Sequence, residues 1–302
     1  MVSIIVCTLQ RDVLLARCLQ SIAEARPNEY DIKEVIVVNN GTDELTANLI
    51  SDMQTQYPVE LVYTKELQTG LSFARNKGAA SAKGSWLFYL DDDGFVHSDA
   101  FLYMQQMIQE GKFDIFGGIY KAIHLSKPPR WLDPNFGTKK VKASKAGPLN
   151  DDAIEGGIMV LKKEVWTKVG GFNTTLGMMG DQPGFGEETD FVQKAIDLGF
   201  KAGIQPAMVM DHVVGEHKYK IGYHLRSYQA LGRDMARTGR PLTLPFGKTL
   251  LATPFRFCRY GIKWLGNKNY YLQNWIWDVW SPLVYVWGYK QGLKNKQHAT
   301  KI

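Results

Sequence analysis

The chain has 302 residues, of which 45% are hydrophobic and 22% charged, so it can bury a sizeable core. Its three cysteines are an odd number without paired spacing, which excludes a disulfide framework. The formal net charge of +6 is unevenly distributed: residues 1–215 hold 21 basic and 27 acidic side chains, and residues 216–302 hold 15 and 3. We therefore expect an acidic catalytic body and a basic tail with an affinity for polyanions.

The cysteines and the N-terminus predict cytosolic chemistry. Cys7 lies in an apolar strand pattern and Cys18 in a helical one, so both are expected to be buried thiols in a reducing compartment. The opening "MVSIIVCTLQRD" is too short for the apolar region of a signal peptide and resembles a strand.

Strand and helix patterns alternate along the first 90 residues. This alternation favours an α/β fold with a mostly parallel sheet and helices on its faces. In such sheets ligands bind beyond the carboxyl ends of the strands. The predicted elements are strand Val2–Cys7, helix Val13–Ala25, strand Glu34–Val38, helix Leu45–Gln56, strand Val59–Thr64, helix Gly70–Ala82 and strand Trp86–Leu90.

Polar segments follow three of the predicted strands, where a ligand is expected. "TLQRD" follows the first and "DDDG" the fourth, while "NNGTDE" follows the second and has amides suited to a base or ribose. A plain Asn-Gly turn would explain "NNGTDE" about as well. The candidate ligand-binding residues in the first two segments are Thr8, Gln10, Arg11, Asn39, Asn40 and Gly41.

Three aspartates, Asp91, Asp92 and Asp93, come directly after an apolar run. Carboxylates this close repel one another unless a cation intervenes. Oxygen ligands suit Mg²⁺ or Mn²⁺, which stay partly hydrated and bridge to substrate phosphates. The triplet therefore predicts a metal site, although helix capping or a solvated loop is the alternative.

The helix Gly70–Ala82 has a basic and amide-bearing stretch. Arg75 is placed to contact a diphosphate or to tie the metal loop to the nucleotide pocket, with Asn76 beside it. A solvated basic helix face is the alternative interpretation.

These ordered motifs resemble the inverting glycosyltransferases of family 2, which have the GT-A fold for nucleotide-diphospho-sugar transfer. The matching segments are "VSIIVCTLQRDVLLARCLQSI", "VIVVNNGTDE", "GLSFARNKGAASAKGSWLFYLDDDG", "EGGIMVLKKEVWTKVGGFNTTLG", "GFGEETDFVQKAIDLGF" and "MDHVV". The resemblance covers roughly residues 2–240 and extends to enzymes of bacterial surface-polysaccharide assembly. It implies a GT-A catalytic domain over residues 1–215 and a C-terminal helical extension, basic and aromatic, over residues 216–302.

The resemblance also implies roles for the acidic residues. Asp91 and Asp93 match the outer positions of the family's Asp-x-Asp motif, Asp92 lies between them at the nucleotide, and His212 matches a histidine that often completes the metal site. The expected cofactor is a divalent metal, Mn²⁺ or Mg²⁺, and the expected donor is a nucleotide-diphosphate sugar. Thr8 and its neighbours would line the nucleotide pocket, with Asn39 or Asn40 near the base and Arg75 and Asn76 nearby.

Three acids in "GEETDF" begin a predicted helix: Glu187, Glu188 and Asp190. Their presence could reflect the ordinary enrichment of acids in a first helical turn. The resemblance places the catalytic base at Glu188, with Glu187 as the alternative and Asp190 positioned to orient the base or touch the acceptor. Inverting transfer needs a base on the acceptor hydroxyl and charge neutralisation at the leaving diphosphate.

The tail predicts membrane association. "HLRSYQALGRDMARTGR" and "TPFRFCRYGIKWLG" are cationic, and Tyr270–Tyr289 has eight aromatic residues without Lys or Arg. We expect helices that lie peripherally on the cytoplasmic face of an anionic membrane, which suits a glycan or lipid-linked acceptor. Packing of the tail on the protein or on a second copy is the alternative. "QALGRD" lacks the Gln-x-x-Arg-Trp spacing of polymerising relatives, which implies single addition.

Other functions fit less well. A nucleotidyltransferase or a dehydrogenase would need a glycine-rich loop after the first strand, and "TLQRDVLLARC" has no glycine. A non-catalytic scaffold of the same fold, or a polyanion-binding protein that uses the basic tail, remains the alternative function. The intact acids argue against a scaffold, and we expect no nucleic-acid partner.

Overall fold

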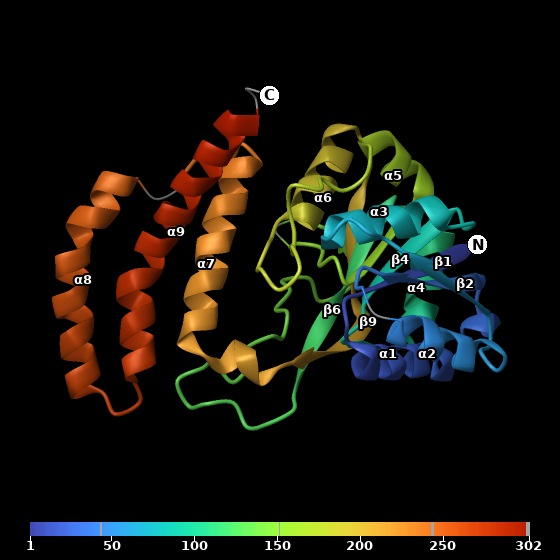
Figure 1. The fold of residues 1–302 in the computed structure, drawn as a ribbon, viewed down its shortest axis with the longest axis horizontal. Helices are drawn as coiled ribbons and strands as arrows, with labels where there is room; N and C mark the ends of the chain where they lie inside the picture. The colour runs from blue at the N-terminus through green and yellow to red at the C-terminus, as the bar shows by residue number, and fades with distance from the viewer. Residues whose placement is uncertain (43, 151, 243–244, 300–302) are drawn as a thin grey trace. The chain divides into compact units, whose positions relative to one another are not determined.

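A computed structural model describes residues 1–42, 44–150, 152–242 and 245–299 of the protein (Figure 1). These residues form two compact units, each made from several stretches of sequence. The first unit comprises Met1–Ile123, Gly137–Thr174 and Glu187–Val213, and the second comprises His124–Phe136, Thr175–Gly186 and Val214–Ile302.

The first unit is built on a mixed sheet with the strand order β3-β2-β1-β4-β8-β6-β9-β5, in which β7 also pairs with β9. Strands β3, β2, β1 and β4 run parallel, whereas β8 pairs antiparallel with β4 and β6, and β9 pairs antiparallel with β5 and β7. The strands are β1 (Val2–Thr8), β2 (Ile32–Asn39), β3 (Glu60–Lys65), β4 (Trp86–Asp91), β5 (Gly94–Val96), β6 (Ile115–His124), β7 (Gly147–Pro148), β8 (Ile158–Lys162) and β9 (Ala202–Val214).

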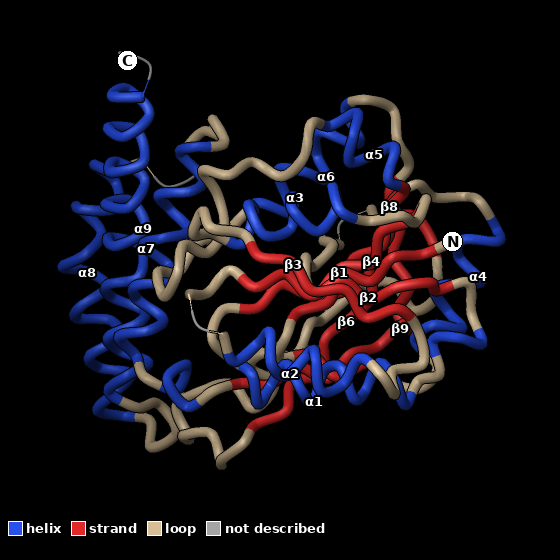
Figure 2. The backbone as a smooth tube through the Cα atoms, turned by 45° about the vertical axis from the view of Figure 1, so that its right-hand side comes forward, coloured by secondary structure: helices blue, strands red, loops and turns tan. Residues whose placement is uncertain are grey.

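Helices cover both faces of this sheet (Figure 2). Because side chains alternate along a strand, Ile4 and Val6 pack in one core with α1 and α4, while Ile5 packs in the other with α3, α5 and α6. The helices of this unit are α1 (Asp12–Glu24), α2 (Leu45–Gln54), α3 (Leu71–Ser81), α4 (Ala100–Glu110), α5 (Lys163–Val169) and α6 (Glu187–Asp197), with the short 3₁₀ helix η1 (Pro27–Glu29).

The predicted alternation of strands and helices over the first 90 residues is confirmed, with ends that differ by at most two residues. Residues beyond β4 add antiparallel strands that the local patterns did not indicate. Their pairing places the N-terminal end of β8 beside Leu90, directly before the Asp triplet. The carboxyl end of β4 therefore lies next to a strand that arrives from the opposite direction.

The second unit contains three long helices (Figure 1): α7 (Ile221–Arg237), α8 (Phe246–Gly266) and α9 (Leu272–Ala299), preceded by the 3₁₀ helix η2 (Glu216–Tyr219). Helix α9 packs against both α7 and α8. Glycines allow α7 and α9 to approach closely, since a Cβ at Gly288 would lie 1.9 Å from the backbone oxygen of Gln229. A Cβ at Gly232 would lie 2.0 Å from the backbone oxygen of Tyr285.

Most of the aromatic segment Tyr270–Tyr289 lies in α9, and one side of it is buried within the second unit, whereas Trp280 and Trp287 are exposed. Val279 and Val286 are fully buried, and Pro282 lies inside the helix without ending it. Asp278 accepts a hydrogen bond of 2.5 Å from the Tyr270 hydroxyl. Within the described part of the chain, no helix combines the length and apolarity needed to cross a bilayer.

Candidate functional site

The Asp triplet forms the tight turn between β4 and β5. Asp91 is the last residue of β4 and Gly94 the first of β5, whereas α4 begins only at Ala100. The triplet therefore caps no helix. A Cβ at Gly94 would lie 2.2 Å from the sulfur of Met210, so glycine lets the Met210 side chain pack directly against this turn.

Asp92 is buried and pins this turn to the end of β1. Its carboxylate accepts a 2.7 Å hydrogen bond from the Thr8 hydroxyl and lies 3.1 Å from the Arg11 guanidinium. Burial raises the pKa of Asp92 to about 7, against the opposing effects of Arg11 and Thr8. These contacts hold Thr8 and Asp92 to each other and leave the more exposed Arg11 at the site's edge.

Asp93 and His212 face each other across the β5–β9 pair. Gly94 is in register with His212, and the Asp93 carbonyl accepts a hydrogen bond from the Val213 amide. The Nε2 atom of His212 lies 3.5 Å from Oδ1 of Asp93, whose Oδ2 accepts a 2.8 Å bond from Arg11. The ring of Tyr120 stacks on His212, with centroids 5.0 Å apart, and fixes the plane of the imidazole.

Asp93 and His212 together fit a divalent metal that is only partly held by protein. Two neighbouring ligands of one octahedral ion lie about 3 Å apart, close to the separation of these two atoms. The described residues contain no group of three or more His, Cys, Asp or Glu arranged to hold a metal. Asp91 belongs to the predicted metal set but turns to Arg75 and Tyr120, so the donor set suits an ion that keeps water and substrate ligands.

Arg75 links the end of β4 to the start of α6. Its buried guanidinium donates a 2.9 Å hydrogen bond to Oε1 of Glu187 and lies 3.5 Å from Oδ1 of Asp91. Burial opposes the charge of Arg75, but the carboxylates of Glu187, Asp91 and Glu188 outweigh burial and raise its pKa. The Asp91–Arg75–Glu187 chain brings residues from three distant parts of the sequence to one point.

The three acids at the start of α6 have different surroundings. Glu187 is buried and bound by Arg75, and Asp190 makes a 2.7 Å ion pair with Lys194 one turn later. Glu188 is half-buried, and burial followed by repulsion from Glu187 raises its pKa well above the usual range of a carboxyl group. Of the three acids, Glu188 is thus the one whose environment makes it the stronger proton acceptor.

The asparagines predicted to bind the nucleotide are engaged within the protein. Asn39 accepts a hydrogen bond from the Gly41 amide and donates to Tyr63, and Asn40 donates to the carbonyls of Glu66 and Gln68. The Asn40 side-chain oxygen also accepts from the Gly70 amide. They shape the loops around the strand ends, while Asp43 of the same segment lies outside the described residues.

Asn76 is hydrogen-bonded within the protein, whereas Gln10 is exposed to solvent. Asn76 binds the backbone of Phe172 through both its oxygen and its nitrogen, at 2.8 and 2.9 Å, and accepts from Trp166. It fixes the loop between α5 and α6. Gln10 is exposed and has a φ of 53°, a left-handed conformation, so its side chain projects from the turn after β1.

Sequence reasoning missed Tyr120, Gly156 and Gly157. The Tyr120 hydroxyl donates to Asp91 at 3.1 Å and accepts from the Gly157 amide at 2.9 Å. A Cβ at Gly156 would lie 2.5 Å from the Arg75 guanidinium, and one at Gly157 would lie 2.0 Å from the Asp91 carboxylate. The adjacent glycines before β8 were the available signal, because such a pair permits close approach of another group.

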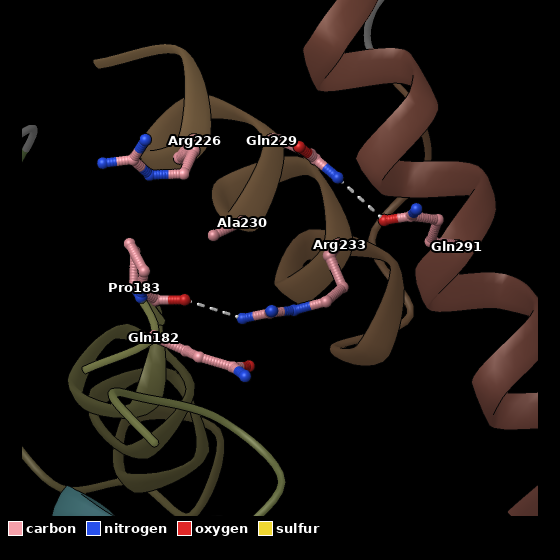
Figure 3. Close-up of a pocket in the computed structure, with 7 residues that line it drawn as sticks. All are labelled: Gln182, Pro183, Arg226, Gln229, Ala230, Arg233 and Gln291. Atoms are coloured by element: carbon pink, nitrogen blue, oxygen red, sulfur yellow. Dashed lines mark hydrogen bonds between the residues drawn. The ribbon is translucent and has the colours of Figure 1, made fainter. Parts of the chain in front are cut away.

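A separate polar cavity of about 150 Å³ lies in the second unit (Figure 3). Its lining includes Gln229 and Arg233, both from the sequence "QALGRD" on α7. Arg233 donates to Asp234 through two nitrogens and to the carbonyl of Pro183, so its charge is balanced within this unit. The cavity contains none of the carboxylates described above.

Comparison with known proteins gives an independent view of this site. The model of the family described as "Glycosyl transferase family 2" matches residues 3–169, which include β1, the Asp triplet, Arg75 and the glycine pair. The succinoglycan biosynthesis protein ExoM of Rhizobium meliloti (strain 1021) is 23% identical over 258 residues, covering 84% of this chain and 81% of ExoM.

Two further relatives differ in how much they share. A GalNAc(5)-diNAcBac-PP-undecaprenol beta-1,3-glucosyltransferase of Campylobacter jejuni is 28% identical over 41% of this chain and 40% of its own length. The solved mannosyltransferase PcManGT of Pyrobaculum calidifontis, in complex with GDP-Man and Mn²⁺, superposes with a TM-score of 0.55 at 18% identity. That match covers 99% of this chain and 79% of the mannosyltransferase, and the predicted fold is confirmed.

Proposed function

Because this chain belongs to glycosyl transferase family 2 and is a glycosyltransferase that uses a nucleotide-sugar donor, we propose that it adds one hexosyl group, with inversion, to a hydroxyl of a glycan or lipid-linked acceptor. The observation that carries the proposal is the Asp91–Arg75–Glu187 chain. It joins the strand end where the donor is expected to the helix start that bears the candidate base.

Glu188 is the proposed general base. It takes the proton of the acceptor hydroxyl as that oxygen bonds to the anomeric carbon, and the bond from this carbon to the diphosphate oxygen breaks. Its raised pKa supports the role, since a carboxylate with a higher pKa is the stronger proton acceptor. Glu187 is a positioning residue that holds Arg75, and Asp190 is proposed to contact the acceptor.

The proposed holders of Mn²⁺ or Mg²⁺ are Asp93 and His212, with Asp91 alongside. When bound, the ion would neutralise charge on the departing diphosphate. Arg11 adds fixed positive charge at the same edge, because it is only partly used by Asp92 and Asp93 and remains 37% exposed.

The proposed nucleotide pocket has two kinds of residue. Gln10 and Arg11 are accessible and would contact the donor directly. The other predicted residues would shape the pocket without contacting the donor, since their polar groups make hydrogen bonds within the protein. They are Thr8, Asn39, Asn40, Gly41, Asn76 and Asp92.

A lipid-linked acceptor at the cytoplasmic face of a membrane is part of the proposal. The names of two relatives support it, since one acts in succinoglycan biosynthesis and the other on a diphosphoundecaprenol-linked glycan. Single addition is supported by the use of Arg233 inside its own unit, bound to Asp234 and Pro183.

The test is transfer of labelled hexoses from UDP-, GDP- and dTDP-sugars to synthetic polyprenyl-diphosphate-linked monosaccharides in Mn²⁺. We expect one donor to give a product extended by a single β- or α-linked sugar, with the anomeric configuration opposite to that of the donor. A product with retained configuration would overturn the inverting mechanism, and a long polymer would overturn single addition.

A further inference from the structure

We propose that the exposed face of α8 docks on an anionic lipid bilayer, with the helix lying in the plane of the headgroups. The face is an apolar stripe of five residues, called here the α8 stripe: Leu251, Phe255, Cys258, Ile262 and Leu265. The inference rests on the membrane location in the proposed function and names the surface that makes the contact, and vesicle binding tests it separately from sugar transfer.

The spacing of the stripe places its members on one side of the helix. Successive members are four, three, four and three residues apart, which is the repeat of a single helical face. All are exposed, and the values for Leu251, Ile262 and Leu265 reach 81%, 73% and 81%. Phe255 is 66% exposed. A contiguous apolar face of this kind marks an interaction site rather than ordinary surface.

The opposite side of α8 is the side that packs on α9. The indole of Trp275 lies edge-on to Phe257, with centroids 4.9 Å apart, and Trp264 also contacts Trp275. Arg256 reaches the backbone of Asp278. The α8 stripe is therefore left over after α8 has made its contacts inside the second unit.

The positive charge of α8 favours an anionic partner. The helix carries Lys248, Arg256, Arg259 and Lys263 and has no acidic residue. Lys248, Arg259 and Lys263 are exposed and follow one edge of the stripe. Basic side chains beside an apolar face attract anionic headgroups.

A second copy of the chain is a poorer partner for the same face. The spacing would suit a coiled-coil seam, but such seams are flanked by opposite charges that pair across the helices. Two copies of α8 would bring only cations together along the contact. A 21-residue helix is about 30 Å long and would lie along the bilayer surface over its whole length.

The test is sedimentation of the full chain with vesicles of phosphatidylcholine alone or mixed equally with phosphatidylglycerol. We expect binding to the anionic vesicles that weakens at least tenfold without phosphatidylglycerol, in 0.5 M NaCl, or in the variant Leu251→Glu/Leu265→Glu. The matched control is Leu102→Glu/Leu198→Glu, which changes two exposed leucines outside α8 and should bind as the wild type does.

The native cysteines provide a second readout that needs no disruptive variant. Cys258 is exposed within the stripe, whereas Cys18 is buried and Cys7 half-buried. A polarity-sensitive fluorophore on Cys258 should shift its emission to the blue with anionic vesicles. An unchanged emission, or equal binding by the stripe variant and the wild type, would overturn the proposal. A stripe variant that dissociates a dimer yet still binds vesicles would assign the stripe to self-association instead.

Discussion

Glu187 and Glu188 are neighbours in sequence but differ in what surrounds them. Only Glu187 is held by Arg75, whereas Glu188 carries the raised pKa. We predict that Glu188→Gln lowers kcat by roughly 10²- to 10⁴-fold, the usual contribution of a general base, with donor binding unchanged. Steady-state transfer assays, with donor affinity measured by titration calorimetry, check this prediction.

Glu187→Gln is the matched comparison and should act on stability. It removes the charge that pairs with the buried Arg75 at 2.9 Å and leaves the 3.5 Å contact to Asp91 as its nearest ion pair, so the free energy of unfolding should fall by about 3 kcal/mol. Urea denaturation of both variants separates the two roles. An equal loss of stability in Glu187→Gln and Glu188→Gln would contradict a structural role for Glu187 and a catalytic role for Glu188.

The raised pKa of Glu188 predicts how activity and stability depend on pH. A base must be ionised, so kcat/KM should fall as the pH drops through a pKa well above the ordinary value of about 4.3. The folded state binds the Glu188 proton more tightly than the unfolded state does. The stability of the wild type relative to Glu188→Gln should therefore decrease as the pH rises through the interval between the unfolded and folded pKa values.

Gly157 tests the close packing beneath Asp91. In Gly157→Ala, a Cβ would meet both the Asp91 carboxylate and the Tyr120 hydroxyl, the latter at 2.3 Å. We predict that the metal-dependent stabilisation by donor is lost. The control is Gly247→Ala, where a Cβ meets nothing within 4 Å and the stability should stay within about 0.5 kcal/mol. Donor binding by Gly157→Ala at the wild-type level would show that this contact has no role.

Candidate site residues could be predicted from the sequence where the chemistry comes from neighbouring residues in the chain. Three adjacent aspartates, and a cluster of acids at a helix start, can be recognised as concentrations of negative charge from the sequence alone. The partners of those charges could not be predicted, because Arg75 meets Glu187 across 112 positions and Tyr120 meets Asp91 across 29. For Asn76 the sequence suggested a ligand contact, because a side-chain amide suits a nucleotide. In the structure this amide binds the Phe172 backbone instead.

At the level of elements, α7 and α9 depend on small residues at their contact. Gly288→Leu would place side-chain atoms where the Gln229 carbonyl lies. The resulting strain should lower the free energy of unfolding of the second unit by about 1–3 kcal/mol. The same change at Gly266, which has open space, should have little effect. Hydrogen exchange in α7 and α9 would locate the loss, and unchanged protection there would contradict this packing.

Periodicity predicted the parallel half of the sheet because each of its strands is a short apolar run between helices. It did not predict the antiparallel half, whose order depends on contacts between β8, β6 and β9 rather than on any local pattern. In the tail, composition indicated aromatic and basic helices correctly. It could not distinguish α9, which packs against both α7 and α8, from α8, whose apolar stripe is exposed.

For the whole molecule, we expect donor binding to depend on a metal and on the Asp93–His212 pair. A nucleoside diphosphate present at 100 times its Kd stabilises the fold by about 2.7 kcal/mol, enough to raise the Tm by several degrees. Removal of the metal with EDTA should abolish this gain if the ion bridges protein and diphosphate.

The most direct measurement is therefore a thermal-shift panel with UDP, dTDP, GDP, CDP and CMP, each with Mn²⁺ or EDTA, on the wild type and on Asp93→Ala. We predict that one diphosphate raises the Tm of the wild type in Mn²⁺ alone and leaves Asp93→Ala unchanged. If no nucleotide shifts the folded wild type, or if the shift survives both EDTA and Asp93→Ala, the proposed donor site is wrong.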